Sequence, residues 1–126
     1  MKKSILIVDD DKSLLSIFEY ILDNADYKIL TASNAEKCLE IIKSPQNIDL
    51  LFLDWKMPEV SGLQLYKSIQ KLKPRLPVLL MTGYAVNTLI NKALQEGIYG
   101  IIHKPFDIEE VLNIIKTIFA VQAPVI

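Results

Sequence analysis

The sequence predicts a doubly wound α/β domain in which five parallel strands alternate with five helices. Three observations predict it: five short apolar runs recur along the chain, segments with helical spacing of apolar residues separate them, and glycine, proline or capping residues mark several junctions. An alternation of strand and helix favours a parallel sheet with right-handed crossovers and with helices on both faces. At 126 residues the chain fits a single domain.

The predicted strands are short, and four of the five apolar runs are continuous. Continuous hydrophobicity is typical of strands that are buried on both faces, because neither side of such a strand meets water. The predicted strands are residues 5–8, 28–31, 50–53, 78–81 and 100–102.

Apolar stripes predict a helix after each of the first two strands. The stripe of the first helix consists of Leu14, Phe18, Ile21, Leu22 and Ala25. The stripe of the second helix consists of Ala35, Leu39 and Ile42. Ser33 stands three residues before Glu36 in the arrangement of a capping box, so we expect Ser33 to cap the second helix.

The last three helices are predicted by stripes and by residues that begin or end a helix. The stripe of the third, between Gly62 and Pro74, consists of Leu65, Ile69 and Leu72. The stripe of the fourth, which ends near Gly97, consists of Val86, Leu89, Ile90, Ala93 and Leu94. Asp107 is the expected cap of the fifth, and the stripe of that helix consists of Ile108, Val111, Leu112, Ile115, Ile118 and Phe119.

Composition and charge exclude several classes of protein. With 51% hydrophobic and 23% charged residues, the chain has the composition of a packed globule and not of a disordered segment. Its formal net charge of −1 provides no overall attraction to nucleic acid or to an anionic membrane, and we expect it to bind neither. The first apolar run is too short for a signal peptide or a membrane span, so we expect a cytoplasmic location.

Polar and charged residues follow four of the five predicted strands. They are Asp9, Asp10 and Asp11 after the first, Asp54 after the third, Thr82 after the fourth and Lys104 after the fifth. In doubly wound sheets, ligands bind beyond the carboxyl ends of the strands. Clustered carboxylates repel one another unless a cation lies among them, and oxygen ligands with open positions suit Mg²⁺. We therefore expect a Mg²⁺ site, although Asp11 fits a cap of the first helix better.

The same residues indicate phosphoryl transfer. A carboxylate next to Mg²⁺ can attack a phosphoryl group, and Lys104 and the hydroxyl group of Thr82 are suitable donors to the transferred oxygens.

Five motifs at these strand ends resemble the signature of receiver domains of bacterial response regulators. In order along the chain they are Val8-Asp9-Asp10, Asp54-Trp55-Lys56-Met57-Pro58, Ser61-Gly62, Met81-Thr82-Gly83 and Lys104-Pro105-Phe106. The resemblance implies a flavodoxin-like three-layer sandwich with strand order 2-1-3-4-5. It implies a receiver domain over residues 1–120, with residues 121–126 as a tail or the start of a linker.

The resemblance also implies roles for the matching residues. Asp54 would be the phosphoacceptor, and Mg²⁺ would be bound directly by Asp10 and Asp54, through water by Asp9, and by the backbone carbonyl group of Lys56.

Further residues would act around the phosphoryl group. Lys104 would pair with its oxygens and would be joined to Pro105 by a cis bond, while Thr82 would sense phosphorylation. Lys56 and Tyr84, each two residues after a site residue, would tune the lifetime of the phosphorylated state, and we expect Tyr84 to slow self-dephosphorylation by shielding the acyl phosphate.

One position departs from the family pattern. Receiver domains commonly carry Tyr or Phe three residues before the lysine, where this chain has Ile101. A branched aliphatic side chain has no polar tip and few χ1 states, which puts the usual aromatic readout in question.

The function implied is a signalling switch. A sensor histidine kinase or a phosphotransfer protein would phosphorylate Asp54, and the surface around the fourth and fifth helices would then change its binding to an output domain, a target protein or a second copy in a homodimer. Such a domain catalyses only its own phosphorylation and dephosphorylation and is not a conventional enzyme.

Three other functions fit parts of the sequence. A pseudo-receiver would keep the fold and bind partners without phosphorylation, and only Ile101 argues for it. A haloacid-dehalogenase-like phosphatase fits the run Asp9-Asp10-Asp11-Lys12-Ser13. That family needs a further acidic metal-binding pair at a later strand, but only one more helix follows Lys104 here, and Asp54 would have no role. A flavodoxin-like cofactor binder needs a phosphate loop after the first strand, where this chain has aspartates that would repel phosphate.

Overall fold

The computed structural model describes residues 2–56, 61–83 and 87–122. Its five parallel strands form one sheet in the order β2-β1-β3-β4-β5, which confirms the predicted topology. The strands are β1 Ser4–Val8, β2 Lys28–Ala32, β3 Leu50–Asp54, β4 Val78–Thr82 and β5 Gly100–His103. Each is one residue longer than predicted, so Asp54 and Thr82 are the last residues of their strands and do not follow them.

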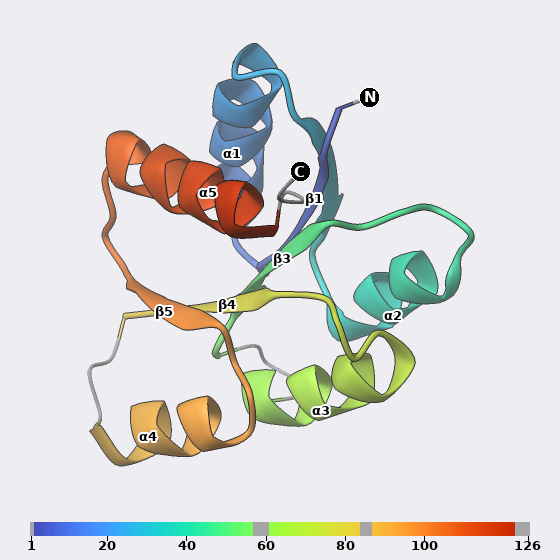
Figure 1. Cartoon of the computed structure of the whole chain (residues 1–126), viewed down its shortest axis with the longest axis vertical. Helices are drawn as coiled ribbons and strands as arrows, with labels where there is room; N and C mark the ends of the chain where they lie inside the picture. The colour runs from blue at the N-terminus through green and yellow to red at the C-terminus, as the bar shows by residue number, and fades with distance from the viewer. Residues whose placement is uncertain (1, 57–60, 84–86, 123–126) are drawn as a thin grey trace.

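Helices cover both faces of the sheet, as predicted. They are α1 Lys12–Asn24, α2 Ala35–Lys43, α3 Gly62–Leu72, α4 Asn87–Gln95 and α5 Ile108–Gln122. Figure 1 shows α1 and α5 above the sheet and α2, α3 and α4 on its other side, which makes three layers. Helix α5 continues two residues beyond the expected domain boundary at residue 120.

Each face of the sheet has its own hydrophobic core, because successive side chains of a strand point to opposite faces. Ile5 and Ile7 of β1 pack toward α1 and α5, whereas Leu6 and Val8 pack toward α2, α3 and α4. The second core also contains Cys38 of α2, whose side chain is fully buried. Burial of one large aliphatic side chain contributes roughly 1.5–3 kcal/mol, so these two layers fix the positions of the strand ends.

The helix starts correct one prediction and confirm another. Asn34, and not Ser33, caps α2, since the side chain of Asn34 accepts a hydrogen bond from the Lys37 N–H at 2.8 Å. Asn caps helices as well as Ser does. Because α2 begins at Ala35, the residue directly before the helix is Asn34 and not Ser33. Asp11 caps α1 as predicted, accepting hydrogen bonds from the N–H groups of Ser13 and Leu14.

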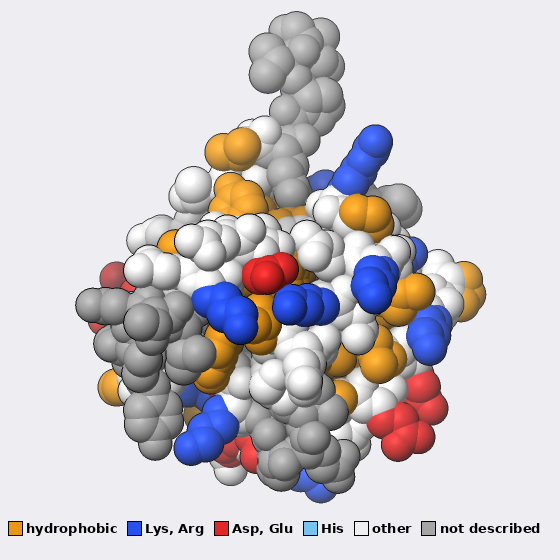
Figure 2. Space-filling model, turned by 90° about the horizontal axis from the view of Figure 1, so that it is seen from below, with side chains coloured by type: hydrophobic (Ala, Val, Ile, Leu, Met, Phe, Trp, Pro, Cys, Tyr) orange, Lys and Arg blue, Asp and Glu red, His pale blue; other side chains and the backbone are white. Residues whose placement is uncertain are grey.

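Some residues of the predicted stripes are exposed. Among the stripe side chains that the structure describes, these are Leu72, Leu94 and Ile108, of which Ile108 lines an apolar groove between α1 and the start of α5. Val86 lies outside the described residues. Figure 2, seen from below, shows the outer face of the α3 and α4 side, where Lys and Arg side chains lie among apolar ones. None of the helices that the structure describes has the length and hydropathy needed to cross a membrane.

Candidate functional site

The carboxyl edge of the sheet gathers the polar groups that the structure buries. Among the described residues, the buried polar or charged ones are Ser4, Asp9, Asp54 and Thr82, and all but Ser4 lie at this edge. Asp9 follows β1, while Asp54 ends β3 and Thr82 ends β4. The parallel register aligns these ends, because β1 pairs with β3, and β3 with β4.

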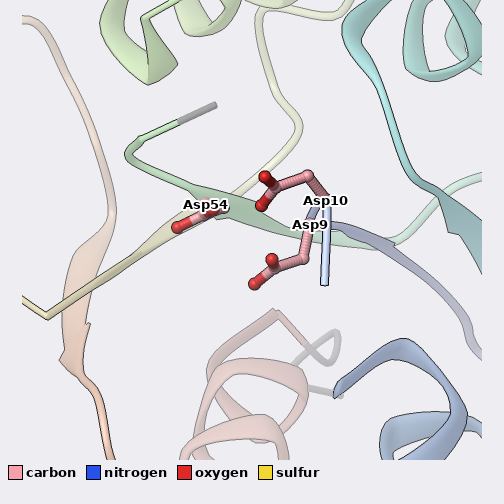
Figure 3. Close-up of side chains that lie close together, drawn as sticks. All are labelled: Asp9, Asp10 and Asp54. Atoms are coloured by element: carbon pink, nitrogen blue, oxygen red, sulfur yellow. The ribbon is translucent and has the colours of Figure 1, made fainter. Parts of the chain in front are cut away.

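Three carboxylates form a cluster at this edge. One oxygen from each of Asp9, Asp10 and Asp54 lies within 4.8 Å of the others. Figure 3 shows their side chains extending to the same side from the ends of β1 and β3. Asp9 and Asp54 are buried and Asp10 is exposed, so the cluster opens to solvent on one side.

The donor set fits Mg²⁺. This ion is usually bound by one or two carboxylates and keeps the rest of its octahedral shell for water or phosphate oxygens. Asp9, Asp10 and Asp54 supply only oxygen donors, and the exposure of Asp10 leaves room for further ligands.

Lys104, which follows β5, is the cation nearest to two of these carboxylates. Its Nζ lies 2.7 Å from Asp9 Oδ2 and 3.3 Å from Asp54 Oδ1. Its backbone N–H donates to the carbonyl oxygen of Thr82 at 2.7 Å, which fixes the start of the β5–α5 connection to the end of β4. The bond between Lys104 and Pro105 is cis, as the resemblance implied.

The surroundings of Asp54 disfavour the ionised form of its carboxyl group. Burial, and then the charge of Asp9, raise the pKa of Asp54 to about 6, although Lys104 and a backbone hydrogen bond from Lys56 lower it. For Lys104, burial disfavours the ammonium form, but the hydrogen bond to Asp9 and the charges of Asp54 and Asp9 outweigh it and raise the pKa. A second cation beside Asp54 would therefore stabilise its ionised form.

The three aspartates after β1 have different environments. Asp9 is 1% exposed, and its Oδ1 accepts a hydrogen bond from the backbone N–H of Asp11 at 3.0 Å. Asp10 projects into the cluster, whereas the side chain of Asp11 caps α1 and is not part of it. The sequence predicted the capping role of Asp11, and the structure adds that Asp9 is buried while Asp10 is exposed.

Gly62 shapes the loop between β3 and α3, a role that the sequence analysis missed. Its N–H donates to the Trp55 carbonyl at 2.8 Å, and a Cβ at this position would lie 2.8 Å from Trp55 Cα. Trp55 in turn donates its N–H to the Met81 carbonyl at 2.9 Å. A glycine is therefore needed for α3 to start close behind the phosphoacceptor candidate, and its place directly after the capping residue Ser61 was the available signal.

The structure describes most of the remaining predicted site residues. Lys56 is exposed and forms an isolated antiparallel bridge with Ser61. Ile101 is partly buried and packs into the core on the α2, α3 and α4 side, and Thr82 is 6% exposed. Tyr84 lies outside the described residues.

Known proteins share both the sequence pattern and the fold. A family model described as a response regulator receiver domain matches residues 5–116. The chain is 30% identical to transcriptional regulatory protein GlrR of Escherichia coli (strain K12), over 95% of this chain and 27% of GlrR. It is 28% identical to sporulation initiation phosphotransferase F of Bacillus subtilis (strain 168), over 92% of this chain and 93% of that protein.

A solved structure agrees with these relatives. The crystal structure of a two-component response regulator from Clostridium difficile matches with a TM-score of 0.93 at 27% identity, over 98% of this chain and 100% of that chain. In length, the chain spans about a quarter of GlrR and most of phosphotransferase F.

Proposed function

This chain belongs to the response regulator receiver domain family, and we propose that it is a switch in which Asp54 accepts a phosphoryl group in a Mg²⁺-dependent reaction. The observation that carries the proposal is the position of Lys104, whose ammonium group lies between the buried carboxylates of Asp9 and Asp54. A buried carboxylate with a cation on one side and the exposed Asp10 on the other is suited to hold a metal and a phosphoryl group together.

Asp9, Asp10 and Asp54 would hold Mg²⁺, with the backbone carbonyl group of Lys56. When bound, Mg²⁺ would neutralise negative charge on the oxygens of the transferred group. The ionised Asp54 carboxylate would attack the phosphorus atom, forming an oxygen–phosphorus bond as the nitrogen–phosphorus bond of a donor phosphohistidine breaks. The released imidazole would then take up a proton.

Lys104 and Thr82 would stabilise the transferred group. The Lys104 ammonium can move from Asp54 to a phosphoryl oxygen because it already lies 3.3 Å from the Asp54 carboxylate. The Thr82 hydroxyl would donate to another oxygen, and its movement would reach the connection between β4 and α4. Ile101, Tyr84, Lys56 and Pro105 would set how long the state lasts and how it is read.

The partners follow from this chemistry. A sensor histidine kinase or a phosphotransfer protein would be the donor, and an output domain, a target protein or a second copy would respond. GlrR is described as a transcriptional regulator and is about four times the length of this chain, so an output domain in the same protein is one proposed arrangement. The receiver domain would occupy residues 1–120, with a tail or linker after it.

Intact-protein mass spectrometry tests the reaction. After incubation with acetyl phosphate and Mg²⁺, the wild-type chain should gain one phosphoryl group, and neither a chelator-treated sample nor Asp54→Asn should gain it. Asp11→Asn is the matched control, because Asp11 lies outside the cluster and Asn also caps helices well. This control should gain the phosphoryl group as the wild type does.

If the folded wild type binds Mg²⁺ but gains nothing, a purified histidine kinase with its phosphohistidine is the next donor. Failure with both donors would refute the phosphoacceptor role and favour the pseudo-receiver. A phosphoryl group that persists in Asp54→Asn would refute the assignment to Asp54.

A further inference from the structure

The end of α4 is attached to α3 at one backbone group. The carbonyl oxygen of Glu96, the residue after α4, accepts hydrogen bonds from Tyr66 Oη at 3.3 Å and from Gln70 Nε2 at 3.1 Å. The Glu96 carboxylate also lies 3.7 Å from Lys67 Nζ. Three side chains of α3 therefore converge on one residue of the α4–β5 connection.

The attachment is built into both elements. Tyr66 is 4% exposed, with its ring packed in the core, so its hydroxyl group has little freedom to move away. Gly97 has a φ of 100°, and a Cβ at this position would lie 3.1 Å from Tyr66 Oη and 3.2 Å from Gln70 Nε2. The glycine thus gives α4 a left-handed ending and gives both donors access to the Glu96 carbonyl.

Backbone hydrogen bonds fix the same turn. The N–H of Ile98 donates to Ala93 at 3.2 Å, and the N–H of Gly97 donates to Leu94 at 3.1 Å, the pattern of a Schellman motif. Ala93 and Ile98 are buried in the core beneath this turn.

The opposite end of α4 lies toward the carboxyl edge of the sheet. Thr82 ends β4, and α4 begins at Asn87. A Cβ at Gly83 would meet none of the described atoms within 4 Å. At nine residues, α4 is a lever of about 13 Å between the Thr82 side and Glu96.

We propose that Tyr66 and Gln70 are positioning residues that hold the Glu96 turn fixed, so that α4 pivots about this turn when Asp54 is phosphorylated. The proposal rests on the function proposed above and adds which part of the surface changes. A helix attached at one end swings at the other, so the beginning of α4 moves most and the Glu96 turn least. The exposed Lys67, which pairs with the Glu96 carboxylate, then keeps its place beside the Glu96 turn.

NMR of the full chain tests the pivot, with beryllofluoride and Mg²⁺ as the probe of the phosphorylated state. In the wild type, amide signals of Asp54, Thr82 and the first turn of α4 should shift. Those of residues 96–98 should shift little and should keep their hydrogen-exchange protection.

The Tyr66→Phe/Gln70→Leu variant should lose the fixed point. Exchange at residues 96–98 should become roughly tenfold faster even without the probe, because two hydrogen bonds to one carbonyl are removed. With the probe, these amides should now shift along with the start of α4. Gln64→Leu, an exposed position on the same helix, is the matched control and should behave as the wild type does.

Three results would overturn the proposal. Wild-type amides of residues 96–98 that shift as much as those of the first turn would show that α4 moves as a whole. Unchanged exchange in the double variant would show that Tyr66 and Gln70 do not hold the turn. Absence of any shift at Asp54 and Thr82 would instead refute the phosphorylation switch, and the pivot with it.

Discussion

The amino ends and the carboxyl ends of the five strands form two opposite edges of the sheet, and charged groups affect stability differently at each. At the amino edge, the buried Ser4 donates its N–H to the half-buried Asp49 carboxylate at 2.8 Å, and the Asp49 N–H donates to the Ser4 carbonyl at 2.8 Å. At the carboxyl edge, Asp9 and Asp54 are buried with Lys104 between them. A carboxylate stabilises the fold at the first edge, whereas two carboxylates lie close together at the second.

This difference shows where the burial of charge lowers stability. Burying charge costs free energy unless partners satisfy it, and one lysine serves two carboxylates here. At the amino edge, the Asp49 carboxylate accepts hydrogen bonds from Ser4 and from the side chain of Asn47. Its burial therefore costs less free energy. Removing a carboxylate should therefore raise stability at the carboxyl edge and lower it at the amino edge.

The largest effect is expected for Lys104→Met in chelator. The substitution removes the cation that faces Asp9 and Asp54, and the free energy of unfolding at pH 7 should fall by about 3 kcal/mol. Added Mg²⁺ should restore more stability to this variant than it adds to the wild type, because Lys104 no longer competes for Asp9. Urea unfolding with and without Mg²⁺ measures both quantities.

Lys116→Met, an exposed lysine on α5, should change stability by less than about 0.5 kcal/mol. If Lys104→Met is as stable as this control in chelator, the carboxyl edge is not under electrostatic strain.

A smaller effect of the opposite sign is expected from Asp54. Burial raises the pKa of Asp54 to about 6, above the value near 4 in an unfolded chain. The folded state then binds more protons between pH 4 and pH 6, so metal-free stability should fall as the pH rises through this range, by on the order of 2 kcal/mol. Above pH 6 this contribution is constant.

Asp54→Asn removes the titrating group and should flatten this part of the pH profile, making the metal-free protein more stable than the wild type at pH 7. Thermal unfolding in chelator across pH 4–7 provides the comparison. Wild-type and Asp54→Asn profiles that run parallel between pH 4 and pH 6 would show that the pKa of Asp54 is not raised in the folded protein.

The smallest effect is expected at the amino edge. Asp49→Ala leaves the buried N–H of Ser4 without its acceptor and should lower the free energy of unfolding by about 1 kcal/mol. The result should not depend on Mg²⁺, since Asp49 lies at the far edge of the sheet from the cluster. Stabilisation by this substitution would remove the contrast between the edges.

Hydrophobicity predicted the strands but not the polar last residues of β3 and β4. Asp54 and Thr82 still pair with their neighbours, Met81 and His103, because the ladder is formed by backbone groups that a polar side chain does not interrupt. A reading based on apolar runs stops one residue early for this reason. The choice of Asn34 over Ser33 as a cap was likewise open, since both residues cap helices well.

The convergence of the site residues could be predicted, because strand ends in a parallel sheet meet at one edge. Their pairing could not. Lys104 lies closer to Asp9 than to Asp54, by 2.7 Å against 3.3 Å, which depends on side-chain packing. The close contact at Gly62 also depends on the fold, since no spacing rule reveals it within its motif, whereas the capping role of Asp11 was predicted.

The buried thiol of Cys38 can report local opening of the layer that contains α2. Its thiol is shielded from solvent in the α2, α3 and α4 layer, and burial raises its pKa to about 12. Because the thiolate is the form that reacts, an alkylating or disulfide reagent meets an inert group while this layer stays closed. The rate of modification then measures how often α2 separates from the sheet, and no label needs to be introduced.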